Sequence, residues 1–145
     1  MVTAPDLTAF PADVGVAIVS HNNRDILPAT LSSLERANCP QSAVLLVDVA
    51  STDDTVAWIR SAYPGVRVER LDKNDGPSPG RNVGIRHTPN RYVFLMDADV
   101  QVRPDTSQRL RAAMGANGRD YIRQNYRWDV ILAKYEKMFL NLRKR

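Results

Sequence analysis

Tyr92-Val93-Phe94-Leu95-Met96-Asp97-Ala98-Asp99 is the stretch that decides the fold of this 145-residue chain. Five large apolar residues lead into two carboxylates spaced i, i+2. So short an apolar run, rich in residues that favour strands, is typical of a buried strand in a parallel sheet. If the chain stays extended beyond Met96, Asp97 and Asp99 project to the same side. Such a pair can chelate a divalent cation, although a turn and a cap are the simpler explanation for an isolated Asp-x-Asp.

The bulk composition limits the class of protein. With 43% apolar and 25% charged residues, the chain resembles a soluble globular protein of one domain. Its single cysteine, Cys39, cannot form an intrachain disulfide, which fits a reducing compartment. Residues 1–13 form a polar N-terminal extension that lacks the basic start and apolar core of a signal peptide. Since no apolar run approaches the roughly 20 residues of a membrane span, we predict a cytoplasmic protein.

The net charge of +4 is unevenly distributed along the chain. Residues 1–104 carry ten Lys and Arg against twelve Asp and Glu, which gives −2, whereas residues 105–145 carry ten against four, which gives +6. Such a shift indicates a change in structural role. The basic end could contact nucleic acid or an anionic surface at the cytoplasmic face of the membrane. A solvated basic helix face explains it more simply, and we expect no nucleic-acid partner.

Three further segments have the pattern of β-strands. Residues 14–20 are almost continuously apolar, and so are residues 43–47, which are followed directly by Asp48. Residues 66–71 alternate between apolar and polar, as expected for a half-exposed strand. Together with the strand that begins at Tyr92, these segments predict a sheet of four strands.

Helical patterns separate the predicted strands. Leu27, Leu31 and Leu34 give the first helix one apolar stripe. Asn22 or Asn23 can cap this helix, because the side-chain oxygen can accept a free backbone N–H. The remaining landmarks are the capping-box pattern Ser51-Thr52-Asp53-Asp54, the polar loop 72–79 and a short helix over residues 80–87.

The order of elements is β-α-β-α-β-α-β, and right-handed crossovers convert it into a parallel sheet. We therefore predict an α/β fold, a Rossmann-like parallel sheet with helices on both faces, followed by C-terminal helices. The carboxyl ends of strands in such a sheet form the edge where ligands bind. Capping alone does not easily explain three polar clusters at this edge: Ser20 with His21, Asp48, and Asp97 with Asp99. The sequence thus predicts a ligand site there.

Four blocks of sequence resemble inverting glycosyltransferase family 2, whose members have the GT-A fold. The blocks are Val16-Ala17-Ile18-Val19-Ser20-His21-Asn22, Val47-Asp48-Val49-Ala50-Ser51-Thr52-Asp53, Gly80-Arg81-Asn82-Val83-Gly84-Ile85 and Met96-Asp97-Ala98-Asp99. The resemblance covers residues 14–105. It departs from the family pattern at Val49, where the family usually has Asn, Asp or Gly, and at His21, where it usually has Tyr.

The resemblance implies a truncated GT-A nucleotide-diphospho-sugar transferase fold and a set of contacts with a nucleotide sugar. Val19, Ser20 and His21 would hold the nucleotide. Asp48 would accept a hydrogen bond from the base, and Arg81 would lie near the base or the diphosphate. A guanidinium suits planar acceptors and phosphates. The simpler alternatives are a turn role for His21 and a solvated helix position for Arg81.

The resemblance further implies a divalent metal, Mn²⁺ or Mg²⁺, at the Asp-x-Asp motif. Asp97 would lie by the ribose and contribute to the metal site, and Asp99 would ligate the metal. The cation would neutralise charge that builds on the departing nucleoside diphosphate, which is Lewis-acid catalysis. The implied reaction transfers a sugar to an acceptor hydroxyl, on a saccharide or a lipid-linked molecule, with inversion at the anomeric carbon.

Inverting transfer also needs a general base within hydrogen-bond reach of the acceptor hydroxyl. In the family this carboxylate lies well downstream of the metal motif. The carboxylates that follow Asp99 are Asp105, Asp120, Asp129 and Glu136. None has a context that resembles the base of the family, so the catalytic residue stays unassigned.

Residues 110–142 resemble something else, the C-terminal end of a family 4 glycosyltransferase with the GT-B fold. Because that fold is different, the pattern indicates a recombined chain with a junction between residues 104 and 114. Apolar residues in this part recur at helical spacing: Trp128, Ile131, Leu132, Tyr135, Met138, Phe139 and Leu142. An amphipathic helix of this kind must bury its apolar face, either on the sheet or in a homodimer.

These observations predict a nucleotide-sugar-binding domain over residues 14–108 and a C-terminal helical segment over residues 109–145. The leading hypothesis is a metal-dependent glycosyltransferase. The alternative is a truncated, non-catalytic nucleotide-binding module that lacks the general base and the acceptor half. A receiver-like signalling domain also gathers acidic residues at strand ends, but the sequence Ser51-Thr52-Asp53 after Asp48 fits it poorly.

Overall fold

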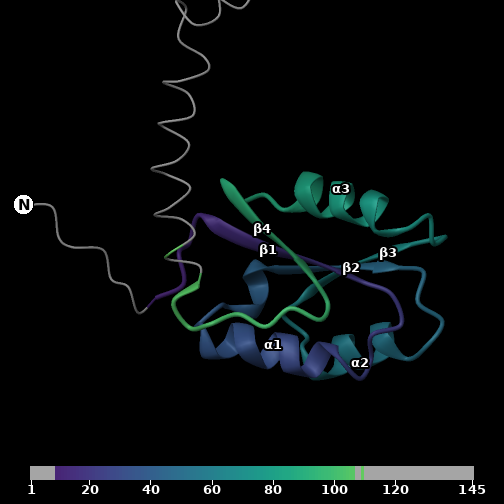
Figure 1. Cartoon of the computed structure of the whole chain (residues 1–145), viewed down its shortest axis with the longest axis horizontal. Helices are drawn as coiled ribbons and strands as arrows, with labels where there is room; N and C mark the ends of the chain where they lie inside the picture. Colours follow the sequence, from purple (N-terminus) through teal and green to yellow (C-terminus); the bar gives the residue numbers. More distant parts are fainter. Residues whose placement is uncertain (1–8, 107–108, 110–145) are drawn as a thin grey trace, which may run out of the picture. The chain divides into compact units, whose positions relative to one another are not determined.

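The computed structural model describes residues 9–106 and residue 109 (Figure 1). The chain divides into two compact units, residues 1–108 and 109–145, and all described residues except Arg109 belong to the first. Within the described part, four strands form one parallel sheet in the order β3-β2-β1-β4. Their bounds are β1 Val14–Ser20, β2 Val44–Val49, β3 Arg67–Leu71 and β4 Tyr92–Asp97. The predicted parallel sheet is therefore confirmed.

Helices cover both faces of this sheet, as predicted. Figure 1 shows α1 and α2 on one face and α3 on the other. Their bounds are α1 Leu27–Arg36, α2 Thr55–Ala62 and α3 Pro77–His87, with a short 3-10 turn η1 at Gln41–Ala43. No helix in the described part is long and apolar enough to cross a membrane. The predicted C-terminal helices fall on residues 110–145, which lie outside the described residues.

The two faces of the sheet are packed differently. On the face of α1 and α2, Ile18 and Leu46 are completely buried in one apolar cluster that includes the predicted stripe of Leu27, Leu31 and Leu34. On the opposite face, α3 lies close to the strands because it presents glycines. An added Cβ on Gly80 would lie 2.9 Å from methyl groups of Val19 and Val49, and one on Gly84 would lie 2.9 Å from the Cβ of Ala17.

The predicted helix caps are wrong in detail. The N-cap of α1 is Ile26, which has no side-chain cap, and the carbonyl of Asn23 accepts the N–H groups of Ile26 and Leu27. A proline in the first turn supplies the helical φ there. For α2 the Ser51 side chain does not cap the helix. Instead, Asp53 Oδ1 accepts the N–H of Thr55 at 3.1 Å, because a short carboxylate readily bonds the backbone two residues on.

Cys39 is expected to react slowly with thiol reagents in the native protein. Its side chain belongs to the apolar core and is 6% exposed, and burial raises the pKa of the thiol to about 12. The pKa of an unfolded thiol is about 8.5. Because the folded pKa is the higher one, the stabilising contribution is complete below the unfolded pKa and is lost as the pH rises through the folded pKa.

Absorbance assays with Ellman's reagent at pH 8, in buffer and in denaturant, measure this difference in reactivity. The control is Cys39→Ala, whose free energy of unfolding should decline less steeply than that of the wild type above a pH of about 8.5. Equal reaction rates in the native and the denatured protein would contradict the burial of the thiol.

Candidate functional site

A cavity of about 360 Å³ lies at the carboxyl edge of the sheet, where the ends of β1 and β4 meet the start of α3. Its volume falls within the range of small-molecule sites. Six of the seven residues expected in a nucleotide-sugar site line it: Val19, Ser20, His21, Arg81, Asp97 and Asp99. The structure thus brings most of the predicted residues together, and the role of each one stays a prediction.

Arg81 and Asp97 form an ion pair in the wall of this cavity. The Nη2 atom of Arg81 donates to both carboxylate oxygens of Asp97, each at 2.8 Å. The pair joins the first turns of α3 to the end of β4. Asp97 is two residues after Leu95, whose side chain contacts Gly84 of α3, so by strand alternation Asp97 lies on the face of the sheet that α3 covers. Both side chains are partly exposed, at 38% and 50%, so a ligand can compete for either partner.

The Asp-x-Asp motif bends instead of staying extended. β4 ends at Asp97, whose carbonyl accepts the N–H of Val100 in a turn. Ala98 is buried, and its carbonyl accepts the hydroxyl of Thr30 in α1. This anchor fixes the turn, so both carboxylates reach the cavity although the chain does not remain a strand. Among the described residues, Asp99 has no ion-pair partner.

Asp48 is the exception among the expected site residues, because it does not line the cavity. β2 continues to Val49, two residues further than predicted, so Asp48 and Val49 point to opposite faces of the sheet and Val49 is the one that meets the cavity. The expectation that the tips of three strands share one cavity is therefore corrected. Strands β1 and β4 contribute polar residues, and β2 contributes Val49.

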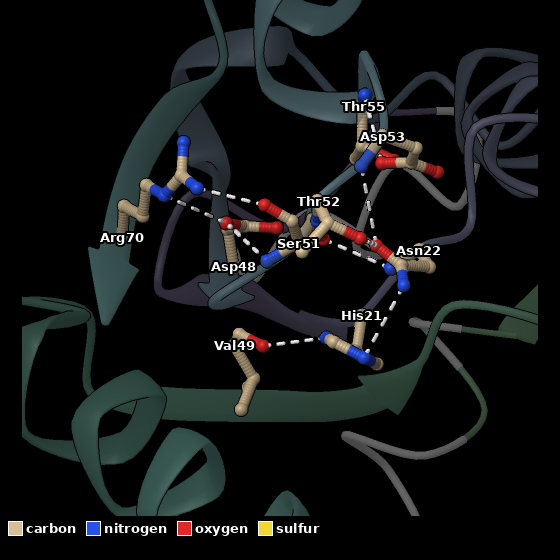
Figure 2. Close-up of polar contacts among 9 residues, drawn as sticks. All are labelled: His21, Asn22, Asp48, Val49, Ser51, Thr52, Asp53, Thr55 and Arg70. Carbon is tan, nitrogen blue, oxygen red and sulfur yellow. Dashed lines mark hydrogen bonds and ion pairs between the residues drawn. The ribbon is translucent and has the colours of Figure 1, made fainter. Parts of the chain in front are cut away.

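The Asp48 side chain is completely buried beside β3. Its Oδ2 atom accepts the N–H of Ser51 at 3.2 Å and lies 3.6 Å from Nε of Arg70 (Figure 2). Its Oδ1 atom has no hydrogen-bond partner within the described residues. A buried carboxylate oxygen without a partner is costly, so this atom is available to a donor from a ligand.

Asn22 fastens the loop after β1 to the loop after β2 (Figure 2). Its backbone N–H donates to Ser51 Oγ at 2.9 Å, and its side-chain oxygen accepts the N–H of Thr52 at 2.7 Å. The adjacent His21 contacts the carbonyl of Val49 through Nδ1 at 2.7 Å. Asn22 has a φ of +54°, a left-handed conformation that Asn tolerates better than most residues. The two loops thus form one unit that positions His21 in the cavity.

Several cavity residues were not anticipated from the sequence. The loop before α3 was predicted only as a connection, yet Asn74, Gly76 and Pro77 line the cavity. Gly76 has a φ of +86°, which favours glycine, and its N–H is held by Asn74 Oδ1 at 2.9 Å. The Asn-x-Gly pattern ahead of the helix was the sequence signal that could have indicated this turn. The other unanticipated lining residues are Asn23, Ile26, Val49 and Ala98.

The acidic residues of the cavity suit a cation whose remaining coordination positions are filled by a bound molecule. The described residues contain no group of three or more His, Cys, Asp or Glu side chains arranged to hold a metal. Asp97 and Asp99 nonetheless both line the cavity. Mg²⁺ is usually bound by one or two carboxylates plus substrate phosphates and water. The donor set therefore suits a metal that is completed by phosphate oxygens.

Comparison with known families decides the family of the chain. The model for "Glycosyl transferase family 2" matches residues 15–134. The chain belongs to glycosyltransferase family 2. The match extends well beyond the four sequence blocks and runs into the segment that resembles family 4, a resemblance that stays a prediction because residues 110–142 lie outside the described part.

Curated relatives of this family-2 chain are longer proteins. "Succinoglycan biosynthesis protein ExoO" of Rhizobium meliloti is 32% identical over 107 residues, which are 73% of this chain and 31% of the relative. "Undecaprenyl-phosphate 4-deoxy-4-formamido-L-arabinose transferase" of Klebsiella pneumoniae is 29% identical over 137 residues, 88% of this chain and 42% of the relative. The chain thus spans about a third to two fifths of the length of these relatives.

Solved structures agree with the fold. S. aureus TarS 1–349 in complex with UDP-GlcNAc matches with a TM-score of 0.62 and 24% identity, over 71% of this chain and 31% of that one. The mannosyltransferase PcManGT from Pyrobaculum calidifontis, in complex with GDP-Man and Mn²⁺, matches with a TM-score of 0.53 and 27% identity. This match covers 66% of the chain and 30% of PcManGT. The parallel sheet with flanking helices is therefore a GT-A-like arrangement.

Proposed function

We propose that this family-2 chain binds a nucleoside-diphosphate sugar in the cavity at the carboxyl edge of the sheet and takes part in transfer of the sugar to an acceptor hydroxyl. The observation that carries the proposal is the cavity itself, which gathers His21, Arg81, Asp97 and Asp99 between β1, β4 and α3. Membership of the glycosyltransferase family supports it, and so does the similarity to PcManGT, a complex with GDP-Man and Mn²⁺.

The proposed nucleotide contacts use residues whose positions suit them. The turn at Val19, Ser20 and His21 borders the nucleotide, and the Arg81 guanidinium faces the base or the diphosphate after it exchanges Asp97 for a phosphate partner. Guanidinium–phosphate hydrogen bonds are strong because both groups are charged. Asp48 would offer its unpaired Oδ1 to an N–H of the base. This last contact requires the base to reach a buried atom behind the cavity wall.

Asp99 would hold Mn²⁺ or Mg²⁺ together with diphosphate oxygens, and Asp97 would contribute to the same site beside the ribose. When bound, the cation supplies Lewis-acid stabilisation of the leaving nucleoside diphosphate. The residues of the chain then orient the donor sugar. Single displacement with inversion at the anomeric carbon is the proposed stereochemistry, in line with the resemblance to inverting enzymes.

The chain's own general base is not assigned. Asp105 is the one downstream carboxylate within the described residues, and it lies 3.5 Å from the Arg103 guanidinium, outside the cavity lining. Asp120, Asp129 and Glu136 lie outside the described residues. We propose that residues 14–108 form the nucleotide-sugar-binding domain and that residues 109–145 form a separate C-terminal segment, whose family 4 resemblance is part of this proposal.

Isothermal titration of the purified chain with UDP and with GDP, each in Mn²⁺, Mg²⁺ or EDTA, tests the proposal. At least one of the two nucleotides should bind, and the Kd should be lower with metal than in EDTA by at least about tenfold, because the cation bridges carboxylate and diphosphate. Absence of binding of both nucleotides under all conditions would refute the proposed function.

A non-catalytic nucleotide-binding module is the second candidate function. The observation that favours it concerns the general base, since Asp105, the one carboxylate after Asp99 within the described residues, pairs with Arg103 outside the cavity lining. Both candidates predict nucleotide binding, so a transfer assay separates them. Release of nucleoside diphosphate from UDP- or GDP-sugars that depends on added acceptor would support the enzyme, and binding without release would support the module.

The acceptor class and the location of the chain are further parts of the proposal. A saccharide or a lipid-linked acceptor is proposed, and the undecaprenyl-phosphate transferase among the relatives supports the lipid-linked class. We further propose a cytoplasmic location, with contact to the cytoplasmic face of the membrane or a homodimer through the C-terminal segment. That segment lies outside the described residues, so its contacts stay predictions.

A further inference from the structure

We propose that Arg70 is a positioning residue of the nucleotide site, acting through Asp48 and Ser51. This inference rests on the proposed function and deepens it, because it concerns how the site distinguishes bases. Arg70 is absent from the cavity lining. It lies on β3, the strand farthest from β4 in the sheet. Its influence must therefore pass through other side chains.

The sheet register brings Arg70 to Asp48. In the parallel pairing of β2 with β3, Asp48 and Arg70 are direct partners, so their side chains project from the same face. Nε of Arg70 lies 3.6 Å from Asp48 Oδ2. The Asp48 side chain is completely buried, whereas that of Arg70 is 54% exposed. Arg70 thus supplies a countercharge to a carboxylate that water does not reach, which a buried charge requires.

Arg70 also fixes the loop that follows β2. Its Nη2 atom donates to the carbonyl of Ser51 at 2.7 Å, while the Ser51 N–H donates to Asp48 Oδ2 at 3.2 Å (Figure 2). Ser51 Oγ in turn accepts the N–H of Asn22, the residue next to His21. The Arg70 guanidinium therefore holds the Asp48 carboxylate and the loop after β2. Through Asn22 it also supports the loop after β1, which carries His21.

This arrangement leaves one atom for a ligand. Oδ2 of Asp48 is committed to Ser51 and Arg70, and Oδ1 has no hydrogen-bond partner among the described residues. A single carboxylate oxygen accepts from an N–H donor. Uracil and guanine present a ring N–H beside a carbonyl, whereas cytosine and adenine present a ring nitrogen lone pair there, which a carboxylate repels. Arg70 would thus sustain a preference for bases with a ring N–H.

The test measures base preference by titrating four nucleotides, UDP, CDP, GDP and ADP, with Mn²⁺ into the wild type and variants. The wild type should prefer UDP over CDP, or GDP over ADP, by at least about tenfold. Arg70→Met should weaken binding of the preferred nucleotide by about tenfold or more and narrow that preference to about threefold or less. A purely structural role would weaken all four nucleotides equally and leave the ratio unchanged.

Arg67→Met is the matched control. Arg67 lies on the same strand, is 49% exposed, and contacts Glu69 and the carbonyl of His87 instead of Asp48. It should leave affinities and ratios at wild-type values. Arg70→Lys covers the case in which the methionine variant does not fold. Lysine keeps the charge but cannot contact Asp48 and the Ser51 carbonyl at once as the guanidinium does. The base preference of Arg70→Lys should therefore lie between that of the wild type and that of Arg70→Met.

The outcomes separate the inference from the proposed function. If the wild type binds none of the four nucleotides, the proposed function fails, and the inference fails with it. If the wild type binds but shows no preference for a ring N–H, the inference alone fails. The inference also fails if Arg70→Met keeps the wild-type base preference, or if Arg70→Lys keeps it in the case in which Arg70→Met does not fold. It fails as well if Arg67→Met narrows the base preference as much as the Arg70 variant does.

Discussion

Replacing Asp99 with asparagine is expected to raise the Kd of the chain for its nucleoside diphosphate in Mn²⁺ by about 10- to 100-fold, up to the Kd measured in EDTA. The carboxylate lines the cavity and has no ion-pair partner within the described residues, so it is the group best placed to hold a cation. Asparagine has almost the same shape but no charge. Binding in EDTA should be the same in both proteins, because the change removes only the metal-dependent part.

Asp105→Asn serves as the control for this experiment. Asp105 is a half-exposed carboxylate beside Arg103, six residues further along and outside the cavity lining. Its replacement should leave the Kd in Mn²⁺ unchanged. If Asp99→Asn binds the nucleotide in Mn²⁺ as tightly as the wild type, Asp99 is not a metal ligand. An equal loss of affinity in Asp99→Asn and Asp105→Asn would indicate a general effect of charge.

Replacing Ile18 with alanine is expected to reduce the free energy of unfolding by about 2–5 kcal/mol. Ile18 lies in β1, the inner strand between β2 and β4, and its side chain is completely buried in the cluster on the face of α1 and α2. Truncation leaves a void that the surrounding strands cannot close. Since domains are stable by only about 5–15 kcal/mol, the loss is a large part of the total. Urea unfolding followed by circular dichroism measures it.

Ile85→Ala provides the comparison, with the same chemical change at a residue that is 52% exposed on α3. Its effect should stay within about 0.5 kcal/mol. Similar losses at the two positions would contradict the placement of the core. The slope of the unfolding transition should be the same for both variants and the wild type, because neither changes the surface exposed on unfolding by much.

The fold could be predicted from the sequence because its signals are local and mutually consistent. Apolar runs of strand length and a leucine stripe at helical spacing define the elements, and the right-handed crossover rule fixes the parallel sheet. The predicted elements therefore match the structure, with shifts only at their ends. The stripe of Leu27, Leu31 and Leu34 is buried as expected.

The site was harder to predict because it depends on which face of the sheet each strand residue takes and on the conformation of the loops. Because β2 stays extended through Val49, Val47 and Val49 both face α3, and Asp48 between them faces the opposite side of the sheet, away from the cavity. Asn22 looked like a helix cap but adopts a left-handed conformation and joins two loops. The partnership of Asp48 with Arg70 depends on the register between strands distant in sequence. No local pattern reports that register.

The two glycines of α3 also bear on how such a site changes size. Gly80 rests against Val19 and Val49, two residues of the cavity wall, and the following residue is Arg81. The side-chain volume at position 80 therefore sets the distance between α3 and the sheet. A single methyl group there would lift the amino end of α3 and carry the arginine outward. A residue outside the cavity lining can thus set the width of the cavity.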